Sequence, residues 1–542
     1  MTVQPRYRTA FSLYPYTRSP EQDGPPVRHP VVVVGGGPVG LALALDLGRR
    51  GTPVLVLDDH DGPGQGSKAL CFAKRTLDIA TRLGVEGLAE AGIVWQVGRV
   101  FHGESEVYRF DLLPEAGHRN PAFVNLPQPA FERAVWEAIV RARDAGAPIE
   151  VRGGNRVTGV ERHDDYAALE VETPDGPYAV EAEWLVACDG ARSPLRTMMD
   201  LPFDGRVFED NFLIADVRMR ADFPTERWFW FEPPFEGAGQ SALLHRQPDD
   251  VWRIDFQLGW NIDRERELDP ACIRARVDAM LSHQTGEVPD YELVWTSIYT
   301  FQCRRMTAFR HGRILFAGDA AHQVSPFGAR GANSGVQDAE NLAWKLDLVL
   351  CGLADEALID TYAIERERAA DENILHSSRA TDFLTPKSGA ARRYRDAVLR
   401  LARGHAFARP LVNSGRLSTP CAYEGIMPGF GPDATGGPAA TAPGCACPDA
   451  PAGQGFLLDL LAGDFVTLAI GGQPATDVVA GGVRARAVHV ARPSPELAAR
   501  YLGDASEAVY LIRPDQHIVA RWPRFAEADV REALLRAVGG RA

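Results

Sequence analysis

The feature that most constrains the fold is a glycine-rich turn between an apolar strand and a helix, in "VVVVGGGPVGLALALDLGRRGTPVLVLDD", residues 31–59. The β-branched run at 31–34 predicts a buried parallel strand. Residues 41–50 are typical of a helix, which Gly51 is expected to end, and a second strand is expected at 54–57. The segment therefore predicts a complete βαβ unit, and with it a chain that folds around a parallel sheet.

Within this turn, Gly35, Gly37 and Gly40 fit the pattern G-x-G-x-x-G. A glycine turn can be purely structural. Here it follows a strand, opens a helix and is followed about 20 residues on by an acid, which is the arrangement of dinucleotide-binding sites. We expect Asp58 to be that acid, rather than Asp59, because Asp58 directly follows the apolar strand. The fingerprint alone does not distinguish a nicotinamide cofactor from a flavin.

The composition narrows the class of protein. The chain has 542 residues, a net charge of −14 and 45% hydrophobic residues. The negative charge argues against a nucleic-acid partner, and no apolar run approaches the roughly 20 residues of a membrane helix. The start of the chain has no pattern of a secretory signal. The eight cysteines are scattered, and even Cys445 and Cys447 lack redox or zinc-ligand spacing, so we expect a cytoplasmic protein without a metal.

Changes of pattern divide the chain. Strand-like alternation fills much of 203–303, and helical patterns run from 333 to about 401. Residues 408–455 are rich in Pro, Gly and Ala, which is typical of a linker. The last hundred residues combine short strands with a closing helix. In the aromatic run 228–231, alternate strand residues face opposite sides, so at most half of them can line a pocket.

Two further acids follow predicted strands. Asp189 stands in "WLVACDGARSPLR", and Asp319 stands in "RILFAGDAAHQVSPFGARGANSGVQDAENLAWKL". The second stretch is crowded with small residues ahead of a helix that begins near Asn333. Small residues let a backbone approach another group closely, and a helix N-terminus presents unpaired N–H groups. We therefore expect a bound group at this loop.

These three motifs, in this order, resemble those of the class A flavoprotein aromatic hydroxylases, which have the para-hydroxybenzoate hydroxylase fold. The resemblance covers roughly residues 30–400 and is strongest to the phenol, 3-(3-hydroxyphenyl)propionate and pentachlorophenol hydroxylases. It implies an α/β protein: a Rossmann-like FAD-binding domain with an inserted antiparallel-sheet substrate domain and a C-terminal thioredoxin-like domain. The implied boundaries are an N-terminal arm at 1–29, an FAD-binding domain at 30–202 and 304–405, a substrate-binding sheet at 203–303, a linker at 406–455 and the thioredoxin-like domain at 456–542.

The resemblance also implies roles for individual residues. Those implied to bind FAD are Gly35, Gly37, Gly40, Asp58, Lys68, Gln128, Val157, Asp189, Asp319, Pro326, Gly331, Ala332 and Asn333. Lys68 stands where the family often has an arginine, and Arg75 is the alternative for that role. Pro326 would lie over the flavin ring, where the reactive oxygen adduct forms. Arg330 stands at a position that varies in this loop of the family; we expect it to be a second catalytic residue that places a positive charge near the ring, and the alternative is that it faces solvent.

The function that the resemblance implies is an FAD-dependent monooxygenase. It would consume NADH or NADPH and molecular oxygen, and hydroxylate a phenolic substrate through a flavin hydroperoxide. A flavin-dependent reductase or dehydrogenase of the same fold is the alternative, and a non-catalytic assembly protein is disfavoured by three intact motifs. The phenol and the group that deprotonates it stay open. His245 and His322 are expected to be structural, and the tail, which lacks C-x-x-C, is expected to serve packing or an interface such as that of a homodimer.

Overall fold

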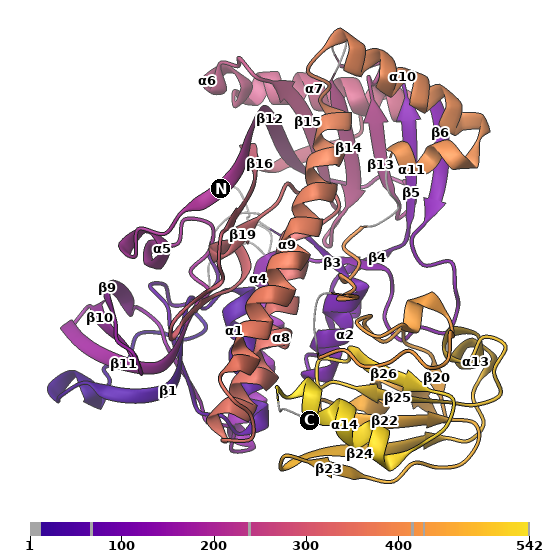
Figure 1. Ribbon diagram of the computed structural model, residues 1–542. Coiled ribbons are helices and arrows are strands. Elements are labelled where there is room, and N and C mark those ends of the chain that lie inside the picture. The colour runs from indigo at the N-terminus through magenta and orange to yellow at the C-terminus, as the bar shows by residue number, and fades with distance from the viewer. Residues whose placement is uncertain (1–11, 65–68, 237–239, 413–416, 426–428, 540–542) are drawn as a thin grey trace.

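A computed structural model of the chain describes residues 12–64, 69–236, 240–412, 417–425 and 429–539 (Figure 1). A mainly parallel sheet, a large antiparallel sheet and a smaller C-terminal sheet form its main bodies. Helix α9 (Ala357–Leu384) runs past all of them. Its first turn packs in the core of the C-terminal sheet through Leu358, and its last turn packs against the antiparallel sheet through Leu384.

The first sheet carries the predicted βαβ unit. Its strands run in the order β17 (Arg310–His311), β18 (Ile314–Phe316), β11 (Gly176–Ala187), β1 (Val27–Val34), β2 (Val54–Leu57) and β8 (Ile149–Arg152), with β10 (Ala167–Thr173) and β9 (Arg156–Arg162) added antiparallel beside β11. β1 pairs in parallel with both β2 and β11, and β18 continues the parallel set. The run 31–34 is buried in the middle of this sheet, as its sequence predicts.

Helix α1 (Pro38–Arg50) begins earlier than its apolar pattern indicates, because proline at the first helical position is pre-set for a helix. It ends at Gly51, whose φ of 92° only glycine adopts readily. The other helices around this sheet are α2 (Lys74–Arg82), α3 (Leu88–Ala91), α4 (Gln128–Asp144), α5 (Pro194–Met198) and α8 (Gly331–Leu350). A small sheet of β3 (Cys71–Ala73), β7 (Phe123–Asn125) and β4 (Ile93–Trp95) lies beside α2.

The second sheet is the large one at the top of Figure 1. Its order is β19 (His322–Gln323), β16 (Tyr291–Met306), β12 (Phe203–Met219), β15 (Val251–Gly259), β14 (Ser241–Arg246), β13 (Arg227–Phe231), β5 (Val97–His102) and β6 (Ser105–Asp111). It is wider than the expected segment 203–303, because β5 and β6 join it from an earlier part of the chain. Local alternation cannot show that β5 pairs with β13 in parallel.

The two faces of this sheet pack against different helices. One face packs on α7 (Pro270–Thr285), with α6 (Arg264–Glu267) just before it, through a core that includes Trp230, Leu244 and Ile254. The opposite face contributes Phe212, Phe231 and others to a core with α9 and α10 (Gly389–Gly404). Side chains alternate along each strand, so the aromatic run 228–231 divides between the two faces, as its sequence predicts.

The C-terminal sheet has the order β23 (Val478–Ala480), β24 (Val483–Val490), β22 (Phe465–Ile470), β25 (Ala508–Ile512) and β26 (Ile518–Trp522). β24 is parallel to β22, whereas β25 and β26 are antiparallel neighbours. Around it lie β20 (Pro451–Ala452), β21 (Gly455–Phe456), α12 (Leu457–Leu461), α13 (Pro495–Tyr501) and α14 (Glu527–Ala537). The sheet packs directly on α8, where the rings of Trp344 and Phe465 meet edge to face at 5.6 Å.

The segment 406–455 contains η3 (Ala406–Ala408), α11 (Arg409–Val412) and η4 (Ala439–Thr441), but it is not the free linker that its composition suggests. Tyr423 and Thr441 are almost fully buried, and Gly444 pairs with Tyr423 and Ile518 through backbone hydrogen bonds. The expectation of a spacer is therefore wrong for the described part of this segment. Pro, Gly and Ala predict irregular backbone, and irregular backbone can be packed as firmly as a strand.

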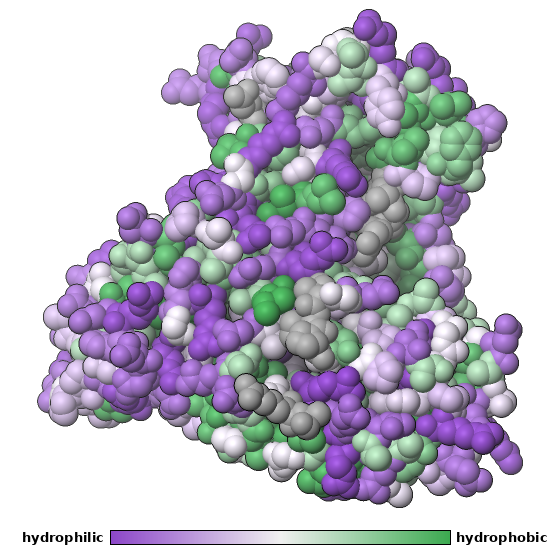
Figure 2. All heavy atoms as spheres, viewed as in Figure 1, coloured by the Kyte–Doolittle hydropathy of each residue, from purple (hydrophilic) through white to green (hydrophobic). Residues whose placement is uncertain are grey.

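The N-terminal arm contains η1 (Pro20–Asp23) and packs on the first sheet through Tyr14, which is 4% exposed. Figure 2 shows a mostly hydrophilic face, with hydrophobic atoms gathered at its upper right, over α10 and α11. Among the residues described, none of the helices is both long and apolar enough to cross a membrane.

Candidate functional site

The three sequence motifs meet at one edge of the parallel sheet. β1, β2, β11 and β18 are parallel, so their carboxyl ends lie at the same edge. The glycine turn follows β1, Asp58 follows β2, Asp189 follows β11 and Asp319 follows β18. Ligands of α/β sheets bind outside the carboxyl ends of the strands. The structure therefore brings together the motifs that the sequence places almost 300 residues apart.

The glycine turn has the shape of a cradle. Gly35 has a φ of 110°, and a Cβ there would meet the carbonyl of Cys188. A Cβ on Gly40 would meet the carbonyl of Gly35, so both glycines are needed for the turn itself. Gly37 differs, because a Cβ there would have no heavy atom within 4 Å. This leaves open space in front of the N-terminus of α1, where a pyrophosphate fits.

Asp58 lies against this turn and not in solvent. Its carboxylate accepts hydrogen bonds from the backbone N–H of Gly36 and, at 2.7 Å, from that of His60. Burial raises the pKa of Asp58, and the two N–H donors oppose that rise. Asp59 is exposed and contacts the ring of His60. The geometry thus favours Asp58 as the acid beside the cradle.

Two hydrogen bonds join the loop that carries Asp189 to the loop that carries Asp319. Arg196 donates to the carbonyl of Ala320 at 2.8 Å, and Gln323 donates to the carbonyl of Ala191 at 2.6 Å. Asp189 accepts from the N–H of Leu195 through one oxygen, while its Oδ1 is buried without a partner in the described part of the chain. Burial raises the pKa of Asp189. Asp319 is exposed at the edge of the sheet.

The loop before α8 is held in a strained turn. Ala329 has a φ of 52°, and its N–H donates to the carbonyl of Pro326 at 2.9 Å. Non-glycine residues in this region of backbone space cluster at functional sites. Pro326 itself is exposed, and a Cβ added to Gly331 would have no heavy atom closer than 3.8 Å. Together they leave space beside the first turn of α8.

Asn333 fixes the position of that first turn. Its Oδ1 accepts from the N–H of Ala73 at 2.8 Å and from the hydroxyl of Thr76 at 2.6 Å. Its Nδ2 donates to the carbonyls of Cys71 and Ala329 at 2.8 and 2.6 Å. The side chain is therefore fully used within the protein. The backbone N–H groups of the first helical turn have no partner inside the helix, and these are the groups implied to face the flavin ring.

Several small residues in this stretch serve helix packing rather than a ligand. A Cβ on Gly335 would lie 2.6 Å from Val39 of α1 and 3.1 Å from the Cα of Gly318. Gly318 likewise faces Val39. The close crossing of α1 and α8 therefore explains two of the glycines, and it brings the N-termini of both helices to the same side of the sheet.

The remaining implied residues are placed less directly. Arg330 is 5% exposed and lies against Gly328 and Asn373, so the alternative that it faces solvent is excluded. Gln128 is half-buried, and its amide bonds Ala69 and Glu132. Val157 is buried in β9, next to the turn where Asn155 donates to the carbonyl of Asp58 at 2.7 Å. Lys68 lies outside the described residues.

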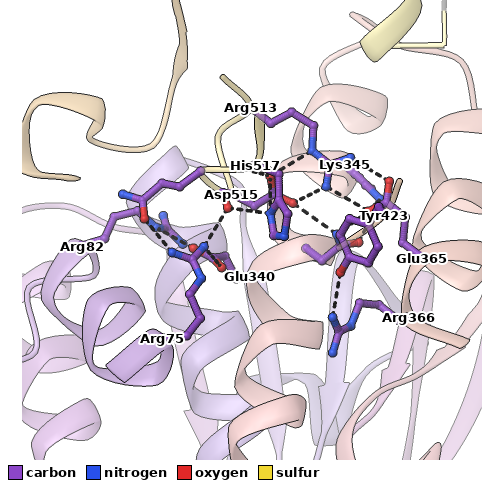
Figure 3. A network of polar contacts seen from close by, with 12 residues as sticks. Arg75, Arg82, Glu340, Lys345, Glu365, Arg366, Tyr423, Arg513, Asp515 and His517 are labelled. Carbon is purple, nitrogen blue, oxygen red and sulfur yellow. Dashed lines mark hydrogen bonds and ion pairs between the residues drawn. The ribbon is translucent and has the colours of Figure 1, made fainter. Parts of the chain in front are cut away.

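Sequence reasoning missed a network of buried charges behind the loop, shown in Figure 3. We call it the tail network. Its members come from α2, α8, α9, the segment around Tyr423 and the turn between β25 and β26, and they are Arg75, Arg82, Glu340, Lys345, Glu365, Arg366, Tyr423, Arg513, Asp515 and His517. Arg513 makes a bidentate bond to Glu365, at 2.7 and 2.9 Å, and a second to Asp515. The network ties the C-terminal sheet to α8.

His322 belongs to the same side of α8 and is structural, as expected. Its Nε2 lies 2.7 Å from Asp338, whose carboxylate also accepts from the N–H of Gly318 and from Arg366. Against the effect of burial, the contacts with His322 and Arg366 hold the pKa of Asp338 below its usual value. This arrangement fixes the backbone on which Asp319 stands.

The chain resembles known flavoproteins over most of its length. The model of the family described as "FAD binding domain" matches residues 28–377. A relative named as a probable NADH-specific resorcinol 4-hydroxylase, from Rhodococcus jostii (strain RHA1), is 33% identical over 437 residues, which are 79% of this chain and 78% of the relative. The 6-methylpretetramide 4-monooxygenase of Streptomyces rimosus is also 33% identical, over 69% of this chain and 64% of that protein.

A solved structure extends the likeness to the tail. The flavin-dependent monooxygenase PieE, in complex with FAD and substrate, is 21% identical and superposes with a TM-score of 0.75. The match covers 95% of this chain and all of that one. It shows that the fold is shared from the FAD-binding region through the C-terminal sheet.

Proposed function

The chain belongs to the FAD binding domain family, and its motifs resemble those of class A aromatic hydroxylases. We propose that it is an FAD-dependent monooxygenase that consumes NADH or NADPH and hydroxylates a phenolic ring. The observation that carries the proposal is the meeting of the glycine cradle, Asp58, Asp189 and the loop before α8 at one edge of the sheet, beside the antiparallel sheet. The resorcinol hydroxylase relative supports a phenol as substrate, whereas the second relative acts on a different compound, so the particular phenol is not assigned.

The residues at the edge of the sheet fit FAD. The open space at Gly37 supports a pyrophosphate held against α1, and we propose that Asp58 would bind the ribose and that the exposed Asp319 would bind the ribityl chain. We also propose Lys68, Gln128, Val157 and Asp189 for the cofactor, with the contacts implied by the family. When bound, FAD supplies electron transfer from NAD(P)H and the activation of oxygen.

The protein contributes positioning and electrostatics. The first-turn N–H groups of Gly331, Ala332 and Asn333 point out of α8, and the positive end of the helix stabilises negative charge on a ring placed there. The buried Arg330 adds a second positive charge behind the loop. Pro326 is exposed in the same loop and would lie over the ring. We propose Pro326 and Arg330 as the catalytic residues of the loop.

The resemblance to the family also suggests how the chain divides into domains. We propose an N-terminal arm at 1–29, an FAD-binding domain at 30–202 and 304–405, an inserted substrate sheet centred on 203–303, and a C-terminal domain at 456–542 joined by 406–455. The order of β24, β22, β25 and β26, with α13 and α14 around them, supports a thioredoxin-like domain. We further propose a cytoplasmic protein, and a homodimer is the assembly to test first.

Labelled dioxygen tests the function. Purified protein is reconstituted with FAD, NADH or NADPH is added with single-ring phenols including resorcinol, and products are examined by mass spectrometry. We expect one labelled oxygen atom in the product and NAD(P)H oxidation matched to it. Phenol-independent NAD(P)H oxidation without labelled product would favour the reductase. A folded protein that takes up no flavin would contradict both enzyme functions.

A further inference from the structure

The face of the antiparallel sheet that looks toward the FAD-binding region carries a group of polar side chains. Side chains alternate along strands, and Leu244, Ile254 and Phe256 pack on the opposite face with α7. His245 of β14 and Asp255 of β15 therefore project toward the FAD-binding region. Their strands are antiparallel neighbours, with His245 opposite Arg253. His245 and Asp255 are thus diagonal neighbours, about 7–8 Å apart by the usual sheet geometry.

One end of this face contacts Cys71, which holds the first turn of α8 in place. The Sγ of Cys71 lies 3.9 Å from Nδ1 of His245, and the carbonyl of Cys71 accepts the bond from Asn333 in the first turn of α8. The other end also touches the loop, because the ring of Phe327 lies 5.3 Å from that of Phe212. Asp255 pairs with Ile214 of β12, which lies two residues along that strand from Phe212. His245 and Asp255 therefore stand between two contacts with the loop that holds the flavin.

Asn125 determines which nitrogen of His245 carries the proton. Trp95 donates its indole N–H to Oδ1 of Asn125 at 2.8 Å, so the NH₂ of Asn125 faces the other way. That NH₂ donates to the carbonyl of Arg246 at 2.7 Å and lies 3.3 Å from Nδ1 of His245. Nδ1 must then be the acceptor, and the neutral ring carries its proton on Nε2.

Both polar groups have an atom without a partner. His245 is 4% exposed, and its Nε2 is buried with no hydrogen-bond partner among the residues described. The same is true of Oδ1 of Asp255, which is likewise enclosed. A buried donor or acceptor without a partner destabilises the folded protein. A donor and an acceptor left open on neighbouring strands of one sheet face, beside the residue that anchors the first turn of α8, indicate a hydroxyl ligand that bonds both.

The charges around the pair suit an anion on the ligand. Arg253 is neutralised by Asp216 through a two-pronged bond, but Arg227, the end residue of β13, adds a second cation whose guanidinium lies over Trp95. Burial raises the pKa of Asp255, which makes it a better proton acceptor than an exposed carboxylate. Burial, with Arg227 and Arg253, holds the pKa of His245 well below its usual value, so the ring stays a neutral donor.

We propose that His245 and Asp255 recognise the ring hydroxyl of the phenolic substrate and remove its proton. The O–H bond of the phenol breaks, its proton forms a new O–H bond at the Asp255 carboxylate, and Nε2–H of His245 donates to the phenolate oxygen. The electron pair stays on that oxygen and activates the ring toward hydroxylation. The inference rests on the proposed function, and it replaces the sequence-based expectation that His245 is structural.

Cys71 does not act as a nucleophile with His245. Its sulfur faces Nδ1, the nitrogen already bonded by Asn125, and burial raises the pKa of the Cys71 thiol. A thiol with a raised pKa holds little thiolate near neutral pH. His245 and Asp255, by contrast, each have an atom available to a ligand on this face.

The test uses the holoenzyme and 4-nitrophenol, whose phenolate absorbs visible light. The variants are Asp255→Asn, His245→Leu and His245→Gln, with the exposed His405→Gln as the matched control. We expect wild type to ionise the bound probe at a lower pH than the free probe. Asp255→Asn and His245→Leu should each raise that midpoint by about one pH unit, a tenfold change in the ionisation constant. His245→Gln retains an N–H donor and should recover part of the shift.

Coupled hydroxylation supplies the second readout. Product formation by Asp255→Asn should fall most at low pH and recover as the pH passes the pKa of the free phenol, because the substrate then arrives ionised. Variants that keep FAD and show the wild-type midpoint and pH profile would overturn the inference while the function stands. So would a wild-type midpoint equal to that of the free probe. If wild type hydroxylates no phenol, the proposed function fails and the inference fails with it.

Discussion

Two buried polar regions of this molecule differ in how many partners their charged groups have, although even the tail network leaves Nε of Arg75 without one among the described residues. In the tail network, ion pairs and hydrogen bonds join the charged groups of α8 and α9 to those of the C-terminal turn (Figure 3). On the sheet face, His245 and Asp255 each keep an atom without a partner among the described residues. Both regions are enclosed, so burial alone does not distinguish them. The comparison teaches that paired burial fixes elements in place, whereas unpaired burial beside a cofactor site marks where a ligand binds.

The tail network also explains why the C-terminal sheet cannot be an independent appendage. Arg75 donates to Gln516 at 2.8 Å and to the carbonyl of Asp515 at 2.7 Å, and it also pairs with Glu340 of α8. Asn341, one residue on, bonds both Glu365 and Asp515. The C-terminal turn therefore completes the charge balance around the helix whose first turn faces the flavin site.

The largest expected effect comes from breaking the tail network at its centre. Arg513→Met removes the partner of both Glu365 and Asp515 and leaves two buried carboxylates without that cation. Removing one member of a buried pair costs about 3–5 kcal/mol. We expect a loss of that size in the free energy of unfolding, measured by denaturant titration, together with weaker FAD retention.

The matched control is Arg484→Met in the same domain. Arg484 pairs with Asp477 at the surface, where the two side chains are 64% and 38% exposed. Because solvent screens that pair, the control should unfold like wild type. An Arg513→Met protein as stable as this control would show that the tail network is not what holds the domains together.

The next effect is a dependence of stability on pH. Arg513 and Lys345 lower the pKa of Glu365 to about 2, against burial, from an ordinary value of 4.5. A lowered carboxyl pKa gives stability that is present above about pH 4.5 and is lost as the pH falls toward about 2. At about 1.4 kcal/mol per unit, the shift corresponds to about 3 kcal/mol.

Unfolding of wild type and Glu365→Gln across this range measures the effect. At pH 7 the variant should be the less stable protein, because it leaves Lys345 without the carboxylate it pairs with and leaves Arg513 with Asp515 alone. The gap between the two proteins should close as the pH falls below 4.5. A gap that stays constant down to about pH 3 would show that Glu365 keeps an ordinary pKa in the folded state.

The region of the flavin site was largely predictable from the sequence, and the tail network was not. Gly35, Asp58, Asp189 and Asp319 each stand within three residues of the end of a strand, so local patterns place them at one edge of a parallel sheet. The partners Glu365 and Arg513 are 148 residues apart, and Arg75 and Gln516 are 441 apart. No local periodicity relates such positions.

Two other details of the site required the packed structure. The small residues ahead of α8 indicate close approach, but sequence cannot say to what, and Gly335 and Gly318 approach Val39 of a neighbouring helix. His245 looked structural because a lone histidine usually is. Its open Nε2 depends on the way Asn125 and Trp95 hold the ring's other nitrogen, and those residues lie on separate elements. The fold class can be predicted from the periodicity of the sequence. A polar atom that lacks a hydrogen-bond partner can be recognised only in the packed structure.

The third prediction concerns an exposed group in the flavin region. Asp319→Ala should leave the protein folded, because the carboxylate is exposed and the backbone beside it is held by Asp338. FAD affinity should fall, since a hydrogen bond to a charged group contributes about 1.5–3 kcal/mol, or roughly 10- to 150-fold. Flavin fluorescence on dilution measures the dissociation constant. Asp360→Ala, an exposed acid on α9, is the control, and equal affinities for the two variants would remove Asp319 from the site.

The smallest expected effect concerns the hydroxyl of Tyr14, and it tests whether this hydrogen-bonded group serves stability, as the tail network does, or FAD binding. Tyr14 of the N-terminal arm is buried, and its hydroxyl donates to the carbonyl of Gly36 at 3.1 Å, beside Asp58. The backbone N–H groups of Leu13 and Tyr14 both donate to the carbonyl of Asp61, so the arm is anchored independently of that hydroxyl. Tyr14→Phe therefore removes one neutral hydrogen bond, worth about 0.5–1.5 kcal/mol, and keeps the ring.

We expect Tyr14→Phe to raise the FAD dissociation constant by up to about tenfold, because the peptide that follows Gly36 forms the floor of the cradle. Its unfolding without flavin should change by no more than the same free energy. Tyr394→Phe, whose side chain on α10 is 57% exposed, is the matched control and should do neither. If Tyr14→Phe lowers stability but leaves FAD binding unchanged, the arm is a structural clamp like the tail network, and the flavin site begins at Gly37 rather than at the arm.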